Sequence, residues 1–307
     1  MYTAYEKGMN TMFDEKKLNI ISKKPGFIAA LDESLRSTPS VLRAYGIPDE
    51  TYHSKEEMLN LVHDMRSRII ISSDFSSTHV IAAILFVDTL NRKIAGMPTS
   101  QYLWEEKEII AFLKIDEGLA VLNNDVQLMN PINDLEKKLE NAKVNKVFGT
   151  KMKSLILGAN PEGIEELVDQ QFTYAKQILN YELLPIIETE VDIHCRDKDK
   201  AEVLLKKALL DNLNQLSSEE KVIIEVTLPV IPDFYEEIIS HPNVIRVLAS
   251  SGGYKQAEAD RKLRQNHGMI ASFSRALEEG LKYSETDFEF DMILKETIAE
   301  IFDASIQ

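Results

Sequence analysis

Eight short apolar runs recur along the chain, each about as long as a β-strand and rich in Ile, Val or Phe. The segments between them are long enough for crossover helices. Strands joined in this way are parallel, and parallel strands buried on both faces show continuous apolar runs rather than strict alternation. The sequence therefore predicts strands over residues 27–32, 81–86, 109–116, 147–153, 183–191, 222–228, 244–250 and 269–275.

The segments between the runs carry helix signals. Asn160 and Pro161 are residue types favoured at an N-cap and at the first helical position, and apolar residues then recur at helical spacing over 164–179. Residues 201–213 show the same periodicity. Residues 69–71 form an alternative short strand, but they end a polar segment that a helix explains better.

Eight strands that alternate with helices predict a (β/α)8 TIM barrel. Residues 1 to about 18 precede the first strand, and we expect them to form a helical N-terminal extension. An open, doubly wound sheet is the alternative fold. No Pro-, Gly- or Ser-rich linker divides the chain, so we expect a single domain over residues 1–307.

Composition narrows the classes of function. The chain carries 35 Lys and Arg against 50 Asp and Glu, and a net charge of −15 argues against a nucleic-acid partner. The lone Cys195 cannot form an intramolecular disulfide, and no apolar run is long enough to cross a membrane. The N-terminus has no secretory signal pattern, so we expect a cytoplasmic protein without a membrane partner.

Charged residues lie at or near the C-terminal ends of the predicted strands. The C-terminal ends of the strands form the active face of such a barrel. Burying a charge is costly unless it is paired, so this placement indicates chemistry in the mouth of the barrel. Residues two apart on a strand point to the same side of it. The charged residues that are two apart on one strand therefore form three pairs, which we expect to point into the barrel. The charged residues are Asp32, Lys114, Asp116, Lys151, Lys153, Glu188, Glu190 and Glu225.

A phosphate site is the second prediction. Ser251, Gly252 and Gly253 follow the seventh strand and open a predicted helix, where backbone N–H groups can face an anion. The eighth strand ends at Arg275, and loops after strands seven and eight are the usual phosphate site of this barrel. Another anion would meet Ser34 and Ser37 after the first strand, together with Lys114, and we expect the two anion sites on opposite sides of the mouth.

Seven stretches in order along the chain resemble class I fructose-1,6-bisphosphate aldolase in its bacterial form, and the resemblance covers nearly the whole sequence. It implies a (β/α)8 barrel without a metal, a lyase of glycolysis that cleaves a phosphorylated ketose through a Schiff base. We expect no cofactor and a sugar phosphate as small-molecule partner, and the oligomeric state stays open. The stretches are FIAALDESLRSTP (27–39), AILF (83–86), FLKIDEGLA (112–120), FGTKMKS (148–154), PIIETEV (185–191), SSGGY (250–254) and ASFSRAL (271–277).

The resemblance also implies roles, position by position. Asp32 matches an acid/base and orienting group, and Lys114 a sugar-phosphate contact. Lys151 and Lys153 match charged groups near the scissile bond. Glu188 matches the proton-transfer acid, and its neighbour Glu190 a group that helps in Schiff-base formation. The phosphate site of dihydroxyacetone phosphate matches Ser251, Gly252, Gly253 and Arg275, and the other phosphate site matches Ser34 and Ser37.

One decisive position departs from the family pattern. The family forms its imine on a lysine of the sixth strand, in a stretch similar to LKLTIP, whereas this chain reads IEVTLP at 224–229 and has Glu225 at the matching position. A carboxylate cannot form a Schiff base, and without the imine the carbanion lacks its electron sink. Lys221 lies about 13 Å down the strand. No lysine occurs between Lys221 and Lys255, so an alignment slip does not restore one.

Three interpretations follow. Lys151 serves as a relocated imine-forming amine, although a neighbouring carboxylate raises its pKa and opposes attack. Alternatively, the barrel binds a sugar phosphate but performs enolisation with Glu225 and Glu188, or aldol chemistry with Mg or Mn recruited by a carboxylate set. Thirdly, the chain is a binding or regulatory protein that does not turn substrate over, or Glu225 was introduced by engineering. The carboxylate set is Asp32, Asp116, Glu188, Glu190 and Glu225.

Overall fold

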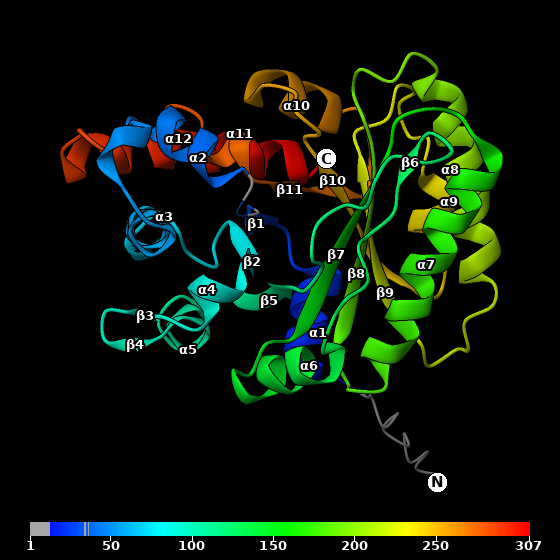
Figure 1. The fold of residues 1–307 in the computed structure, drawn as a ribbon, viewed down its shortest axis with the longest axis horizontal. Helices are drawn as coiled ribbons and strands as arrows, with labels where there is room; N and C mark the ends of the chain where they lie inside the picture. Colours follow the sequence, from blue (N-terminus) through cyan, green and yellow to red (C-terminus); the bar gives the residue numbers. More distant parts are fainter. Residues whose placement is uncertain (1–12, 34, 36) are drawn as a thin grey trace, which may run out of the picture.

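The computed structural model describes residues 13–33, 35 and 37–307, and its main feature is a closed barrel of eight parallel strands (Figure 1). The last strand pairs with the first, which closes the ring. The predicted (β/α)8 barrel is therefore confirmed, and the open doubly wound sheet is wrong. In their order around the ring, the strands are β1 (Phe27–Leu31), β2 (Val80–Leu85), β5 (Ile110–Lys114), β7 (Gly149–Ile156), β8 (Leu184–Val191), β9 (Val222–Thr227), β10 (Val244–Ser250) and β11 (Met269–Phe273).

Strand ends differ from the prediction by a few residues. The main correction concerns the eighth strand, which ends at Phe273 and not at Arg275. Ser274 leaves the extended conformation, with φ −107° and ψ −87°, and Arg275 begins the short helix α11 (Arg275–Glu278). Residues 69–71 lie in helix α3 (Lys55–Ile71), as the sequence predicts.

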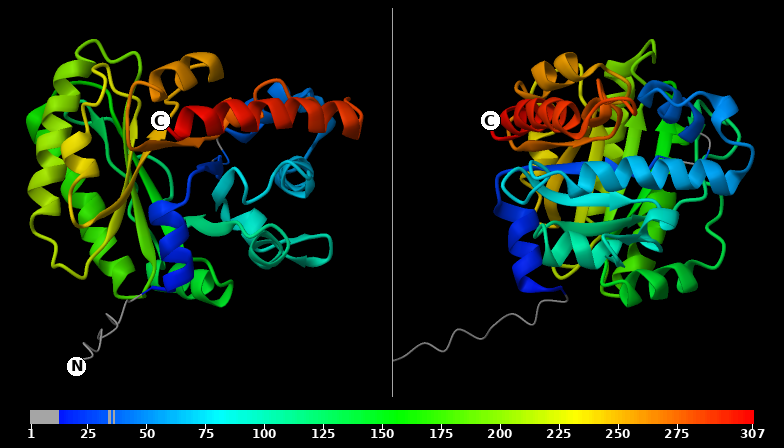
Figure 2. Two further views of the ribbon diagram at one scale, coloured as in Figure 1. Left: turned by 180° about the vertical axis from the view of Figure 1, so that it is seen from behind. Right: turned by 90° about the vertical axis from the view of Figure 1, so that its left-hand side faces the viewer.

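Helices cover the outside of the barrel (Figures 1 and 2). Helix α7 lies against β7 and β8 on one side of the ring, and α12 lies against β11 and β1 on another. The apolar face of α7 packs on the strands because Ile164, Leu167 and Val168 recur at helical spacing. Besides α3 and α11, the helices are α1 (Glu15–Lys23), α2 (Thr38–Tyr45), η1 (Asp49–Thr51), α4 (Val87–Leu90), α5 (Thr99–Glu105), α6 (Leu135–Val144), α7 (Pro161–Leu179), α8 (Lys198–Leu213), α9 (Glu236–Ile239), α10 (Gln256–Leu263) and α12 (Asp287–Ser305).

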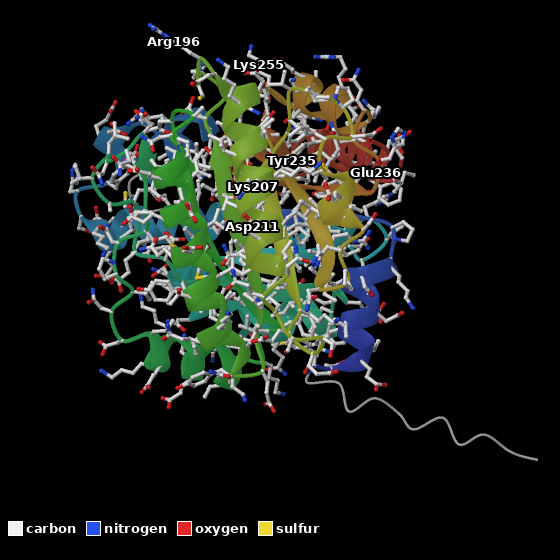
Figure 3. All side chains as sticks on the ribbon, turned by 90° about the vertical axis from the view of Figure 1, so that its right-hand side faces the viewer. Arg196, Lys207, Asp211, Tyr235, Glu236 and Lys255 are labelled. Carbon is white, nitrogen blue, oxygen red and sulfur yellow. The ribbon has the colours of Figure 1, made fainter. Side chains whose placement is uncertain are left out.

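Three short strands lie outside the ring. β3 (Lys93–Ile94) and β4 (Met97–Pro98) form a small antiparallel pair, and β6 (Val126–Gln127) adds to the edge of β7 in antiparallel register. On the solvent face of α8, Figure 3 shows Lys207 and Asp211, whose Nζ and Oδ2 atoms lie 2.6 Å apart. Such exposed pairs contribute little to stability. None of the helices in the described ranges is both long and apolar enough to span a bilayer.

Alternate residues of each strand point into the barrel, and their chemistry changes from one end to the other. Ile28 and Ala30 belong to the interior apolar cluster, and Asp32 follows them at the same parity on β1. On β8, Ile186 belongs to the same cluster and is followed by Glu188 and then Glu190. The lower interior is therefore a packed apolar core, and the charged side chains collect at the C-terminal mouth.

Helix α1 closes the lower end of the barrel. Ile21 on this helix is fully buried in the interior cluster, and Arg246 of β10 donates to the carbonyl oxygens of Ile21 and Lys24 at 2.9 and 3.2 Å. The expected N-terminal extension is thus helical over Glu15–Lys23, which continues past the expected end near residue 18. The expected helix over residues 1–12 lies outside the described part of the chain.

Candidate active site

A cavity of about 980 Å³ lies at the C-terminal ends of the barrel strands. Its walls bring together candidate residues from seven strands and the loops that follow them. Gly253 lines an adjacent cavity of about 350 Å³, which shares Arg275 with the first. Ser34 lies outside the described residues. The predicted site residues that line the large cavity are Asp32, Ser37, Lys114, Asp116, Lys151, Lys153, Glu188, Glu190, Glu225, Ser251, Gly252 and Arg275.

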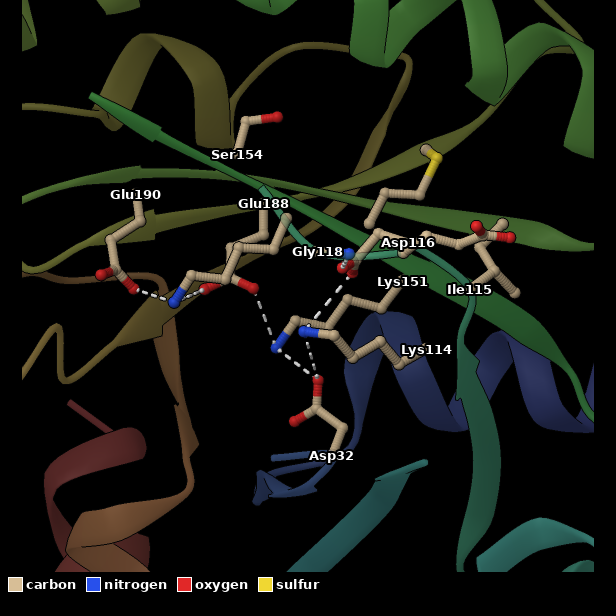
Figure 4. A network of polar contacts seen from close by, with 12 residues as sticks. Asp32, Lys114, Ile115, Asp116, Gly118, Lys151, Ser154, Glu188 and Glu190 are labelled. Carbon is tan, nitrogen blue, oxygen red and sulfur yellow. Dashed lines mark hydrogen bonds and ion pairs between the residues drawn. The ribbon is translucent and has the colours of Figure 1, made fainter. Parts of the chain in front are cut away.

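Lys151 lies at the centre of the charged side chains (Figure 4). Its Nζ atom is 3.1 Å from Glu188 Oε2, 3.4 Å from Asp32 Oδ2 and 3.3 Å from Glu225 Oε1. These four residues come from four strands, β7, β8, β9 and the end of β1, and each is at most 5% exposed. One ammonium group therefore holds three buried carboxyl groups together.

Two further lysines flank this centre. Lys114 Nζ lies 3.4 Å from Asp116 Oδ2 and 3.7 Å from Asp32 Oδ2. On the other side, Lys153 Nζ lies 2.5 Å from Glu190 Oε2 and 3.4 Å from Glu188 Oε1. The three same-side pairs predicted from strand spacing thus converge in one continuous network of alternating charges.

The network keeps its lysines protonated. Burial opposes the charge of Lys151, but Asp32, Glu188 and Glu225 outweigh burial and raise its pKa well above the ordinary value. The pKa values of Lys114 and Lys153 are raised in the same way, because their carboxylate neighbours outweigh the effect of burial.

The carboxyl groups of the network differ from one another. Burial would raise the pKa of Asp32 and of Glu188, but the nearby lysines, Lys151 first, lower both below their ordinary values. Glu225 has no exposed surface, and burial raises its pKa to about 8 even though Lys151 acts in the opposite direction. Asp32 and Glu188 are therefore ionised at neutral pH, whereas Glu225 is mostly protonated.

Backbone geometry fixes Glu225 beside its neighbours. It lies on β9 opposite Glu188 of β8 and Leu248 of β10 in the parallel register. Its Oε2 atom is buried and has no hydrogen-bond partner in the described part of the chain. Lys221 lies near the other end of β9 and donates to the carbonyl oxygen of Pro242 at 3.0 Å, far from this network.

The Ser251–Gly253 turn requires glycine for two reasons. Gly252 and Gly253 have φ values of 58° and 113°, which L side chains rarely adopt. A Cβ atom on Gly252 would also lie 2.5 Å from Thr227 Cγ2. Arg275 is close by, because a Cβ on Gly253 would lie 3.5 Å from its Nη2 atom. The structure thus brings the predicted turn and the predicted clamp together, just before helix α10.

The second predicted anion group is placed differently from expectation. Ser37 follows β1 and lines the same cavity, but β1 pairs directly with β11, the strand before Arg275. The strand order makes the two loops neighbours around the ring and does not put them on opposite sides of the mouth. The expectation of opposite sides was therefore wrong, because a closed barrel requires its first and last strands to pair.

Relatives across nearly the whole chain decide the family. The chain is 52% identical over 293 residues to a fructose-bisphosphate aldolase class 1 of Synechocystis, covering 95% of this chain and 98% of that protein. Aldolases of the same class from Porphyromonas gingivalis and Clostridium acetobutylicum are 48% and 50% identical, and the matches cover at least 95% of this chain and 99% of each relative. The protein belongs to the class I fructose-bisphosphate aldolase family.

The fold agrees with a solved structure of an aldolase. A Plasmodium falciparum fructose-bisphosphate aldolase matches with a TM-score of 0.73 at 18% identity, over 95% of this chain and 94% of that one. At that identity the match supports the barrel fold only. No protein-family model matches the chain.

The carboxylates of this aldolase family member are neutralised by lysines. Within the described ranges, no group of three or more His, Cys, Asp or Glu side chains is arranged to hold a metal ion. The acidic set considered from the sequence is instead interleaved with Lys114, Lys151 and Lys153. Nothing in its geometry favours a recruited Mg or Mn.

Sequence reasoning missed one group next to the aldolase site. Arg66, on α3, is only 1% exposed and pairs with Glu33, the residue after Asp32. A signal was present, because Arg66 lies between Ile69 and Ile70 around a predicted helix, where an arginine needs a buried partner. Which residue supplies that partner depends on tertiary structure.

Proposed function

We propose that this aldolase family member binds a phosphorylated ketose or triose in the mouth of its barrel, and that imine-dependent cleavage of fructose 1,6-bisphosphate is strongly reduced. The proposal is carried by one observation. Glu225, which the resemblance matches to the family's imine lysine, is fully buried, and its Oε1 atom is 3.3 Å from Lys151.

Binding is supported by the groups that line the cavity. Arg275 and the turn containing Ser251 and Gly252 combine a guanidinium with backbone N–H groups next to a helix N-terminus, which suits a phosphate. The relatives named above are fructose-bisphosphate aldolases, whose substrate is such a phosphorylated sugar. A volume of about 980 Å³ leaves room for a six-carbon sugar bisphosphate.

Reduced imine chemistry is supported by the state of the lysines. An amine attacks a carbonyl only when it is neutral. With a pKa above 10.5, fewer than about one amine in three thousand is neutral at pH 7, and Lys114, Lys151 and Lys153 all fall in this range. A relocated imine on Lys151 would also have to break its contacts with three carboxyl groups.

Borohydride trapping tests the proposal. Incubation with dihydroxyacetone phosphate and borohydride, followed by peptide mass spectrometry, should give no reduced adduct on the wild-type protein. Glu225→Lys should gain an adduct at position 225, together with measurable cleavage of fructose 1,6-bisphosphate. Glu190→Lys is the matched control, because it also places a lysine in the mouth but on β8. An adduct on Lys151 of the wild type would contradict the proposal.

Enolisation is a second candidate function, favoured by the unpaired Oε2 atom of Glu225. A carboxyl with a pKa of about 8 suits proton transfer near neutral pH. Its ionised form would take a proton from the carbon beside the carbonyl of dihydroxyacetone phosphate and then return it, while Lys151 donates to the carbonyl oxygen. In D₂O, proton NMR should then show deuterium uptake that rises with pH up to about 8. Equal uptake in Glu225→Gln would exclude this role.

A further inference from the structure

Arg66 and Glu33 form a buried ion pair beside the phosphate-binding loops. Arg66 Nη2 donates to Glu33 Oε2 at 2.7 Å, and Nη1 donates to Thr89 Oγ1 at 2.9 Å. The two charged side chains are 2% and 6% exposed. Thr89 belongs to α4, after β2, and Glu33 follows β1. One guanidinium thus joins two neighbouring loops of the barrel mouth.

The second oxygen of Glu33 reaches a third loop. Its Oε1 atom accepts a hydrogen bond from the hydroxyl of Ser274, the residue immediately before Arg275. Ser274 occupies the N-cap position of α11, where a serine side chain usually bonds to the N–H groups of the first turn. It makes no such bond here, so its hydroxyl serves Glu33 and not the helix.

Unlike the buried Arg66–Glu33 pair, Arg275 is exposed to solvent. Its side chain reaches toward Gly253, and the residue is exposed at the edge of the cavity. A long arginine side chain has many rotamers, and fixing them on binding costs free energy. The direction in which the Arg275 side chain leaves the backbone depends on where that backbone is held, and the adjoining Ser274 is anchored to the buried ion pair.

We propose that Glu33 and Ser274 are positioning residues for phosphate binding, because they hold the backbone that directs Arg275 over the Ser251–Gly253 turn. Arg66 supplies the charge that keeps Glu33 in place. This inference rests on the proposed phosphate site, and it adds that the affinity for phosphate depends on how Glu33 and Ser274 hold the backbone of Arg275. Glu33 and Ser274 act by holding the backbone of the loop that follows β11.

Calorimetric titration with inorganic phosphate tests the inference. Ser274→Ala removes the hydroxyl alone, and we expect its affinity for phosphate to fall about fivefold, the effect of one hydrogen bond. Ser274→Thr keeps the hydroxyl and should bind nearly as tightly as the wild type. Ser305→Ala is the matched control. It removes the hydroxyl of a buried serine that accepts from the backbone N–H of Ala271 on β11 at 3.1 Å, away from the cavity.

A double-mutant cycle separates positioning from a general structural effect. Arg275→Ala should weaken phosphate binding by tenfold or more, and adding Ser274→Ala to it should cause no further loss, because the hydroxyl acts through Arg275. A further fivefold loss in the double variant would overturn the inference. So would unchanged binding by Ser274→Ala, or an equal loss in Ser305→Ala.

The same data distinguish this inference from the proposed function. If Arg275→Ala binds phosphate as the wild type does, the phosphate site itself is wrong, and the positioning role fails with it. If Arg275→Ala loses affinity while Ser274→Ala does not, the phosphate site stands and only the positioning role is overturned. Glu33→Gln keeps an acceptor for Ser274 but loses the ion pair, and it should fall between the wild type and Ser274→Ala.

Discussion

Replacing Glu225 with Gln should make the protein more stable at neutral and alkaline pH and should change its stability by less than about 1 kcal/mol near pH 5. Burial raises the pKa of Glu225 from 4.5 to about 8, so the folded protein keeps a proton that the unfolded chain releases between these values. The folded state then binds more protons, and its free energy of unfolding falls as the pH rises through this window. Gln has the shape of the protonated acid and does not titrate.

The size of the effect follows from the same two values. Each pH unit between 4.5 and about 8 changes the free energy of unfolding by about 1.4 kcal/mol. The variant should therefore exceed the wild type by roughly 3 kcal/mol at pH 7 and by on the order of 5 kcal/mol at pH 9. Titration of the neighbouring charged groups does not contribute to this difference in stability. Asp32 and Glu188 have lowered pKa values and Lys151 a raised one, so all three keep their charges from pH 5 to 9.

Urea unfolding of both proteins at several pH values between 5 and 9 measures this difference directly. Glu56→Gln is the control, because it makes the same substitution at an exposed residue on α3. A constant difference between wild type and Glu225→Gln across the whole range would refute the reasoning. It would mean that Glu225 is ionised in the folded protein and that Lys151 outweighs burial.

Two glycine variants and one helix-cap variant test other parts of the structure. Gly252→Ala should lose phosphate affinity in a calorimetric titration, because its Cβ would meet Thr227, whereas Gly96→Ala has positive φ but open space and should bind normally. Gly149→Ala should give little folded protein by circular dichroism, since its Cβ would overlap the carbonyl oxygen of Leu184; a folded variant would contradict the β7–β8 packing. Thr286→Ala breaks a capping box at the start of α12 and should cost about 1 kcal/mol in urea unfolding, with unchanged phosphate binding.

The sequence by itself determined the barrel and most of the residues in its mouth. Continuous apolar runs separated by helix-length segments admit few folds, and the period of two along a strand puts Lys151 and Lys153, or Glu188 and Glu190, on one side. Because Asp32 follows the apolar Ala30 at the same parity, the sequence alone assigns this strand end to the mouth.

Tertiary structure decided which of the charged side chains in the mouth are in contact. Strand periodicity cannot show that Lys151 contacts carboxyl groups on three other strands, because that depends on register and closure around the ring. Packing inside the ring also buries Glu225 completely, so that its pKa rises despite the lysine beside it. Periodicity along one strand is local, whereas burial and charge pairing depend on residues far apart in the chain, and only the folded barrel brings those together.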